Sequence, residues 1–376
     1  MPSNRAAWLT AKSVRPLEVK TAPYTSPSTN EIVIKNGAIA VNPVEWSKQL
    51  VGDMMISWIK YPFILGNDLA GEVVEVGPGV TRFKPGDRVL GHALSMDPTV
   101  NKNSEGAFQE YTVVRANMAS PIPDDLSYEE ACVLPLGLST AACALFQKDT
   151  LALNYPDVAA TGTGDSKKTG NEALLIWGVS SSVGCNAIQL AAAAGYDVFT
   201  TASPKNFEYV TSLGASKVFN YRSSTVIPDI IRAFNGKKPV GAIAIGNGST
   251  EACIEILSKT NGSKFVAQVS FPWPEKTPTT ALALFGAMMG LMWWNLSIFF
   301  KSKLKGVTAK FVFGSTLYNN EVGGIIYDDF LPDALVQGSF VMAPQPLVAG
   351  KGLEMIQEAL DFHMKGVSAK KVIVSL

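Results

Sequence analysis

Short β-branched runs, broken by glycine and proline, dominate the first third of the chain. Residues 31–114 hold four of them: EIVIKNGAIAV, AGEVVEVG, DRVLGHA and FQEYTVV. Apolar and polar positions alternate along these runs, which is typical of strands with one buried face. The pattern predicts a small barrel-like β module in this part of the chain.

From Ser127 onward the pattern changes to helices that alternate with strands. Ser127 is followed by Glu129 and Glu130, an order typical of a helix N-cap with acids in the first turn. Five apolar runs then recur at the spacing of βαβ units, at residues 173–178, 196–202, 217–221, 240–246 and 264–270. Because helical stretches lie between these runs, parallel strands with right-handed crossovers are predicted.

Composition narrows the classes of function. The 376 residues are 47% hydrophobic and 17% charged, which exceeds the needs of one minimal core and predicts two domains. Lysine plus arginine (32) equals aspartate plus glutamate (32), so no net charge draws the protein to nucleic acid. The first ten residues contain no apolar signal segment, and a cytoplasmic protein is expected.

Histidine and cysteine usage limits metal chemistry. The sequence contains two histidines, His92 and His363, which excludes a three-histidine zinc site. The cysteines form no C-x-x-C pair, and each lies among apolar residues. Reduced, packed thiols are therefore expected at Cys132, Cys143, Cys185 and Cys253.

A glycine- and serine-rich turn follows the run at 173–178. Residues 178–184 read GVSSSVG and precede Ala, Ile and Leu at helical spacing. Strand, tight turn and helix stand in the order that a dinucleotide fold needs, because small residues let backbone N–H groups approach a pyrophosphate. An ordinary loop before a helix is the alternative interpretation.

The end of the next predicted strand bears on the choice of nucleotide. An NAD enzyme places an acid there for the ribose hydroxyl, whereas this chain has Ser203-Pro-Lys205-Asn206. A cation without an acid favours a 2′-phosphate, and hence NADPH. Alternatively, Lys205 is a solvated lysine in the first turn of a helix.

With these motifs in order, the sequence resembles the medium-chain dehydrogenase/reductase superfamily over nearly its full length. The resemblance rests on residues 66–91, the turn GVSSSVG and the ending GVSAKKVIVSL. It is most similar to the zinc-independent quinone-oxidoreductase and fungal trans-acting enoyl-reductase branch. The segments that carry this narrower resemblance are NPVEW, LPLGLSTAA, TASPKNFEYVTSLGASKVFNYR and FGSTLY.

The resemblance implies an α/β fold with two domains. A GroES-like β-barrel catalytic domain would cover residues 1–130 and be completed by 317–376, and a Rossmann domain with a doubly wound parallel sheet would cover 131–316. Matching motifs imply contacts to NADPH at Val44, Glu45, Trp46, Ser180, Ser181, Ser182, Val183, Ser203, Lys205, Asn206, Tyr221, Val269, Ser270, Val367 and Ser368.

Two departures from family patterns matter. Zinc alcohol dehydrogenases have a Cys and a Gly-His-Glu as ligands, and this chain has Val44 or Glu45 and Gly66-Asn67-Asp68 at the corresponding places. No metal site is therefore expected. Enoyl-reductase relatives commonly carry Lys after the position of Trp46, where this chain has Ser47 and then Lys48.

These features favour an NADPH-dependent, zinc-independent reductase of an activated C=C. Hydride would go to the β-carbon of an enone or enoyl group, and hydrogen-bond donors would stabilise the enolate. Candidate donors are Ser47, Lys48, Ser139 and Thr140, although both Ser47 and Lys48 could be ordinary surface residues. Quinone reduction, or cofactor binding with a non-redox step, remain alternatives.

The expected partners follow from this hypothesis. They are a small hydrophobic substrate of secondary metabolism and, as a candidate, a polyketide synthase; the chain would be a monomer or homodimer. Residues 277–300 contain no charge and are long enough to cross a bilayer. A span would disrupt the Rossmann domain, so a buried pocket wall, a membrane-surface contact or an oligomer contact is expected instead.

Overall fold

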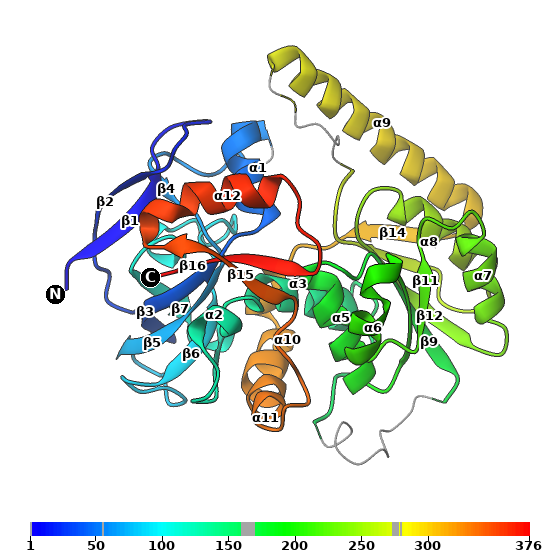
Figure 1. Cartoon of the computed structure of the whole chain (residues 1–376), viewed down its shortest axis with the longest axis horizontal. Coiled ribbons are helices and arrows are strands. Elements are labelled where there is room, and N and C mark those ends of the chain that lie inside the picture. The colour runs from blue at the N-terminus through cyan, green and yellow to red at the C-terminus, as the bar shows by residue number, and fades with distance from the viewer. Residues whose placement is uncertain (1, 55, 159–169, 273–277, 279) are drawn as a thin grey trace. The chain divides into compact units, whose positions relative to one another are not determined.

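The chain divides into two compact units. The computed structural model describes all residues except 1, 55, 159–169, 273–277 and 279. Unit 1 contains residues 1–139 and 315–376, and unit 2 contains residues 140–314. Figure 1 shows that the two chain termini both lie in unit 1.

Unit 1 is built on two sheets. The smaller sheet has the order β2-β1-β4, and the larger has the order β15-β16-β3-β5-β6-β8, with β7 paired to β3. Their strands are β1 (Asn4–Leu9), β2 (Glu18–Ala22), β3 (Glu31–Ala40), β4 (Phe63–Ile64), β5 (Asp68–Val76), β6 (Arg88–His92), β7 (Tyr111–Arg115), β8 (Ala119–Pro121), β15 (Gln345–Lys351) and β16 (Lys370–Ser375). The C-terminal strand β16 pairs antiparallel with β3, so the tail completes the β module that the sequence predicts.

Short helices surround these sheets. They are α1 (Pro43–Val51), α2 (Tyr128–Ala131), α10 (Glu321–Gly324), α11 (Leu331–Val336) and α12 (Ile356–Met364), with a π-helical turn at Ile325–Phe330. The helix α3 (Pro135–Phe146) contains the boundary between the units. Ser127 is the N-cap of α2, and its side chain accepts from the N–H of Glu130, which confirms the predicted helix start.

Unit 2 contains one parallel sheet of six strands. The strands are β9 (Glu172–Trp177), β10 (Asp197–Ala202), β11 (Lys217–Asn220), β12 (Lys238–Ala244), β13 (Phe265–Gln268) and β14 (Thr308–Phe311). Their order is β11-β10-β9-β12-β13-β14, which is the order 3-2-1-4-5-6 of a Rossmann sheet. The predicted doubly wound α/β class is confirmed, and each of the five predicted runs overlaps a strand.

Five helices connect these strands: α5 (Ser182–Ala193), α6 (Phe207–Ser212), α7 (Val226–Ala233), α8 (Ser249–Ser258) and α9 (Ala281–Lys305). The core between sheet and helices includes Leu175, Ile230 and Ile256, all fully buried. The four cysteines are free and buried, as expected. Two segments of the described chain have the length and composition of a membrane span, and of these Tyr128–Phe146 lies mostly inside the fold.

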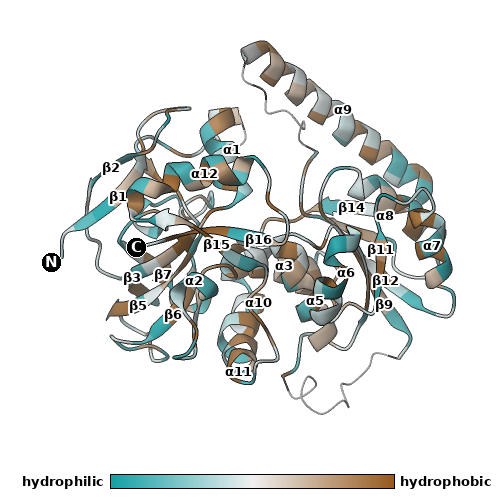
Figure 2. Ribbon diagram, in the orientation of Figure 1, coloured by the Kyte–Doolittle hydropathy of each residue, from teal (hydrophilic) through white to brown (hydrophobic). Residues whose placement is uncertain are grey.

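The apolar side chains of helix α9, unlike those of the core, are largely exposed. A buried pocket wall was one expectation for residues 277–300, but none of the side chains from Leu282 to Trp293 is buried. In Figure 2 the ribbon of this helix carries brown segments along much of its length. Within the described residues, therefore, the interpretation as a buried wall is not supported.

Buried titratable groups are concentrated in unit 1. Burial and the neighbouring Asp68 raise the pKa of Glu45 to about 8. Burial lowers the pKa of His92 and that of His363 to about 4 in each case. Near pH 6.5 the folded protein thus holds Glu45 protonated and both histidines neutral.

These shifts predict that stability is nearly level at acidic pH and falls above neutrality. Between about pH 4.5 and 6 the unfolded chain binds two protons on the histidines, and the folded chain binds one on Glu45 and one on Asp328, whose pKa burial raises to about 6, so these groups leave stability nearly unchanged. Between about pH 6.5 and 8, of these groups only Glu45 in the folded chain holds a proton, so stability falls by about 1.4 kcal/mol per pH unit. Urea unfolding across this range measures both parts of the dependence.

The variant Glu45→Gln isolates the alkaline half of this dependence. Glutamine keeps an acceptor for the N–H of Asn42, which Glu45 now binds at 2.6 Å, but it cannot lose a proton. The fall above pH 6.5 should disappear in this variant and persist in the exposed control Glu18→Gln. An unchanged fall in Glu45→Gln would contradict the prediction.

Candidate functional site

The sharp turn after β9 depends on two glycines. Gly178 has φ +89°, and a Cβ there would lie 2.2 Å from the carbonyl oxygen of Ile245. A Cβ on Gly184 would lie 2.4 Å from the Cα of Val179, so the first turn of α5 packs directly on the end of β9. Because any side chain would push these segments apart, only glycine allows both approaches.

Three serines fill the turn between these glycines. Ser181 is the N-cap of α5: its Oγ accepts from the N–H of Gly184 at 3.2 Å and donates to the carbonyl of Gly178 at 3.0 Å. Ser182 and Val183 begin the helix and are half-buried. Backbone N–H groups in a first helical turn lack intrahelical partners and attract anions. The turn can therefore hold a pyrophosphate.

Asn206 links this turn to the end of the next strand. Its Nδ2 donates to Ser180 Oγ at 2.7 Å and lies 3.4 Å from Ser203 Oγ. Ser203 directly follows β10, and Asn206 is buried. The structure thus brings together three of the residues predicted to contact the nucleotide.

The adjoining edge of the sheet is cationic. Strands β10 and β11 are neighbours with Ala202 opposite Asn220, so the chain leaves both at the same edge. Lys205 and Tyr221 are exposed there. The guanidinium of Arg222 lies 4.8 Å from the centroid of the Tyr221 ring, a cation that the sequence motifs did not single out. Its position directly after Tyr221 was the available signal.

The ends of β12 and β13 are tied together at the same side of the sheet. The N–H of Val269 donates to the carbonyl of Ala244 at 3.0 Å, and Ser270 Oγ accepts from the N–H of Gly246 at 2.6 Å. Both predicted residues are half-buried. They lie at the carboxyl ends of the strands, beyond the point between β9 and β12 where the strand order reverses, which is where open α/β sheets bind ligands.

In unit 1, helix α1 carries five predicted residues. Val44 and Trp46 are half-buried, whereas Glu45, Ser47 and Lys48 are buried. The Trp46 indole N–H donates to Nδ1 of His363 at 3.0 Å. The predicted pair Val367 and Ser368 lies in the loop between α12 and β16.

Lys48 is engaged by its own unit. Its ammonium donates to the carbonyls of Gly52 at 3.2 Å and Ile56 at 2.8 Å, and pairs with Asp53 at 3.0 Å. The ammonium also lies 5.0 Å from the centroid of the Tyr61 ring. Since an ammonium has three protons, an enolate would have to displace one of these partners. The predicted catalytic role of Lys48 stays a prediction without support from this geometry.

Ser139 lies in a buried chain of hydrogen bonds. Tyr327 donates to the carbonyl of Pro135 at 3.0 Å, so it accepts from Ser139 at 2.8 Å. Ser139 in turn accepts from Nδ1–H of His92 at 2.9 Å, which leaves Nε2 of His92 with the lone pair. Its hydroxyl proton is therefore directed to Tyr327. Thr140, the next predicted residue, is buried at the start of unit 2.

A buried ion pair occupies the region of the expected metal-ligand positions. Lys371 Nζ lies 2.7 Å from Asp68 Oδ2, with both side chains buried, and also donates to Asn42. Asp68 further accepts from Asn42 Nδ2 at 3.0 Å and from the N–H of Leu136 at 2.6 Å. In the described part of the chain, no group of three His, Cys, Asp or Glu side chains is placed to hold a metal ion.

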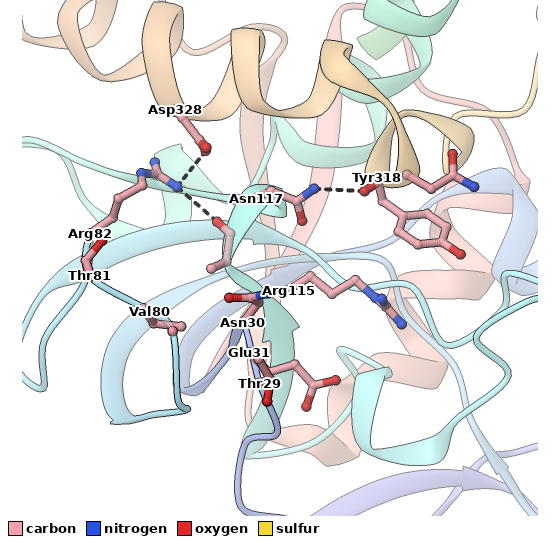
Figure 3. A pocket seen from close by; sticks show the side chains of 13 residues that line it. Thr29, Asn30, Glu31, Val80, Thr81, Arg82, Arg115, Asn117, Tyr318 and Asp328 are labelled. Atoms are coloured by element: carbon pink, nitrogen blue, oxygen red, sulfur yellow. Dashed lines mark hydrogen bonds and ion pairs between the residues drawn. The ribbon is translucent and has the colours of Figure 1, made fainter.

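Unit 1 also has a surface cavity of about 550 Å³ that contains none of the predicted residues. Figure 3 shows Arg82, Arg115 and Asp328 at its wall. Arg82 pairs with Asp328 at 2.5 Å, and Arg115 pairs with Glu105 at 3.3 Å. Because both guanidinium groups are already engaged, this cavity offers a ligand little free charge.

Comparison with known proteins agrees with this geometry. Residues 28–124 match the family model described as the alcohol dehydrogenase GroES-like domain. The chain is 54% identical to dehydrogenase pigH of Monascus ruber over 100% of both chains. It is 37% identical to trans-enoyl reductase himH of Aspergillus japonicus, over 99% of this chain and 97% of that protein.

Among solved structures, the CurK enoyl reductase has a similar fold. It matches with a TM-score of 0.70 at 18% identity, covering 100% of this chain and 99% of that one. Three observations support the same family: similarity to the fungal relatives over the full length, the match to the GroES-like domain and the Rossmann strand order. The chain belongs to the medium-chain dehydrogenase/reductase superfamily of oxidoreductases, with the fungal dehydrogenases and trans-enoyl reductases.

Proposed function

We propose that this protein is an NADPH-dependent reductase of an activated C=C, acting without zinc on a hydrophobic enone or enoyl thioester. The observation that carries the proposal is the pairing of an anion-binding turn at α5 with the cationic edge formed by Lys205 and Arg222. The trans-enoyl reductase named among the relatives supports the reaction type.

The preference for NADPH rests on charge. Between Ala202 and Asn206 the chain has no acid that could accept hydrogen bonds from a free ribose diol. Lys205 and Arg222 instead follow two adjacent strands, and Ser203 adds a hydroxyl beside them. A 2′-phosphate gains charge-assisted hydrogen bonds from such groups, whereas NADH gains none. These cationic groups therefore favour NADPH over NADH through contacts to its 2′-phosphate.

The reaction balances with NADPH as the only reductant. When bound, NADPH would supply a hydride to the β-carbon; the C=C electrons would move to the carbonyl oxygen, and the resulting enolate would take a proton from solvent at the α-carbon. The products are NADP⁺ and the saturated carbonyl compound. The protein's contribution is to position the reactants and to supply donors for the enolate.

We propose zinc independence because the side chains that could bind a metal here already have hydrogen-bond or ion-pair partners. Asp68 is saturated by Lys371, Asn42 and a backbone N–H, and His363 Nδ1 accepts from Trp46. A cation at Asp68 would have to displace the buried ammonium. Hydrogen-bond donors, rather than a Lewis acid, would then polarise the carbonyl.

The setting of the enzyme completes the proposal. We propose a cytoplasmic enzyme of secondary metabolism, either acting on free substrate or receiving a chain from a polyketide synthase. Quinone reduction is the second candidate, since both reactions deliver hydride from the same nicotinamide to an electron-poor carbon or oxygen. A cofactor-binding relative with a non-redox step is the third.

The reaction itself is tested with labelled cofactor. With NADPH carrying deuterium on the transferred C4 position, a medium-chain 2-enoyl thioester should be reduced with the deuterium at its β-carbon, as read by mass spectrometry and NMR. Turnover of benzoquinones with none of enones or enoyl thioesters would favour the second candidate. Tight NADPH binding without oxidation by any of these acceptors would favour the third.

Cofactor choice is tested at the cationic edge. Lys205→Ala and Arg222→Ala should each weaken NADPH binding about 10- to 100-fold, because each removes a charge-assisted contact to the phosphate. NADH binding should change less than about threefold. Calorimetric titration with both nucleotides measures the difference. Lys217→Ala, which removes an exposed cation at the opposite end of β11, is the matched control, and equal losses for the two nucleotides would overturn the assignment.

The predicted hydroxyl donors are tested one at a time. If Thr140 or Ser47 donates to the enolate, Thr140→Val or Ser47→Ala should lower kcat about 100-fold with little change in KM, because the contact forms in the transition state. Ser139→Ala should instead lower thermal stability, since it leaves His92 and Tyr327 without their shared partner. Unchanged kcat in both Thr140→Val and Ser47→Ala would remove these hydroxyls from the mechanism.

A further inference from the structure

Helix α9 exposes an unusually apolar surface. It has 25 residues, and its first acidic or basic side chain is Lys301. Leu282 is 80% exposed, Phe285 62% and Trp293 63%. Within Leu282–Lys305, only 6% of the most apolar 18-residue stretch is buried. Exposed apolar area on this scale marks a surface that something else covers.

The C-terminal half of α9 is anchored in unit 2. The Trp294 indole N–H donates to Glu251 on α8 at 2.7 Å, Ile298 joins the buried core, and Lys305 pairs with Glu255 on α8. These three positions lie on one face of the helix, at a spacing of four and seven residues. From Leu282 to Trp293 no side chain is buried, so this first half extends from the unit that holds it.

The exposed apolar residues in the first half of α9 form one stripe along the helix. At about 100° per residue, Leu282, Phe285, Met292 and Trp293 lie within about 100° of one another around the helix axis. A helix that lies in a membrane interface buries one such apolar face among the acyl chains and headgroups.

The residue types on and near this stripe match a membrane surface. Trp293 lies on the stripe, and Lys301 and Lys303 follow in the last turns of the helix, whereas Trp294 and Lys305 face α8. Tryptophan favours the boundary between hydrocarbon and headgroups, and lysine favours anionic headgroups. Lys301 and Lys303 are exposed, and no acid occurs anywhere in the helix.

The topology excludes a span across the bilayer. The helix connects β13 to β14, which are adjacent parallel strands of one sheet, so the strands before and after α9 belong to one folded unit. A single span would place these two paired strands on opposite sides of the bilayer. A helix lying along the surface keeps both strands on one side.

We propose that α9 docks this protein on the cytoplasmic surface of a membrane containing anionic lipid. The apolar side chains of residues 282–293 would lie among the acyl chains near the headgroups, and Lys301 and Lys303 would contact lipid phosphate or carboxylate groups. This inference does not depend on the cofactor or on the reaction proposed above.

Vesicle flotation of the full chain tests the proposal. The protein should float with vesicles of phosphatidylcholine containing about one-third phosphatidylserine, bind less to pure phosphatidylcholine, and be partly released by salt. The paired substitution Phe285→Glu with Trp293→Glu should lower the partition coefficient at least about tenfold. Lys301→Glu with Lys303→Glu should remove the preference for the anionic vesicles.

Control variants separate lipid binding from misfolding and from self-association. Val336→Glu places one acid on another exposed apolar residue, 75% exposed in unit 1, and should leave flotation unchanged. Circular dichroism and thermal unfolding confirm that each variant is folded. The proposal is overturned if the unmodified protein stays with neither vesicle, or if the α9 variants float normally. It is also overturned if, without lipid, light scattering shows a dimer that Phe285→Glu with Trp293→Glu converts to monomer.

Discussion

Close approach of the backbone at the end of β9 is the constraint on which the nucleotide site depends. A phosphate can be held by the first N–H groups of α5 only if the chain turns sharply and the helix packs directly on the strand. Gly178 and Gly184 meet these two requirements, because a Cβ at either position would collide with neighbouring backbone. The serines then complete the turn, with Ser181 capping the helix and Ser180 bound to Asn206. The Rossmann strand order places this turn where the sheet reverses direction, beside the cationic edge.

Unit 1 depends on a different interaction, the buried pair of Asp68 and Lys371. Burying two charges is costly unless each is paired and its remaining hydrogen bonds are filled. Asn42 and the N–H of Leu136 fill those of Asp68, so residues from β5, β16 and α3 are held around one carboxylate. The same pair sets the electrostatics around Glu45, where Asp68 raises the carboxyl pKa and Lys371 partly opposes it. A lysine from the C-terminal strand thus supplies the positive charge beside Asp68.

The sequence predicted those parts of the molecule that local pattern controls. β-branched runs at fixed spacing located the strands of unit 2, and Ser127 with its acids located a helix start. The turn residues 178–184 were found because only small residues satisfy that geometry. Arg222 was missed, since its place beside β10 follows from strand pairing between segments about 20 residues apart. The engagement of Lys48 by Gly52 and Ile56 was missed for the same reason: it depends on how the loop after α1 folds back.

Helix α9 shows why composition alone could not assign a location to an apolar segment. The same 24 residues could form a core helix, a pocket wall or a span, and these differ only in what surrounds them. Anchoring on α8 fixes one end, while adjacency of β13 and β14 forbids a crossing. The proposed surface-bound position would matter if the enzyme acts on apolar substrates, as proposed above. Such substrates partition into lipid, so a reductase held at the membrane would meet them at a higher concentration than one in solution. Charge on the final turn would then determine which membrane it meets.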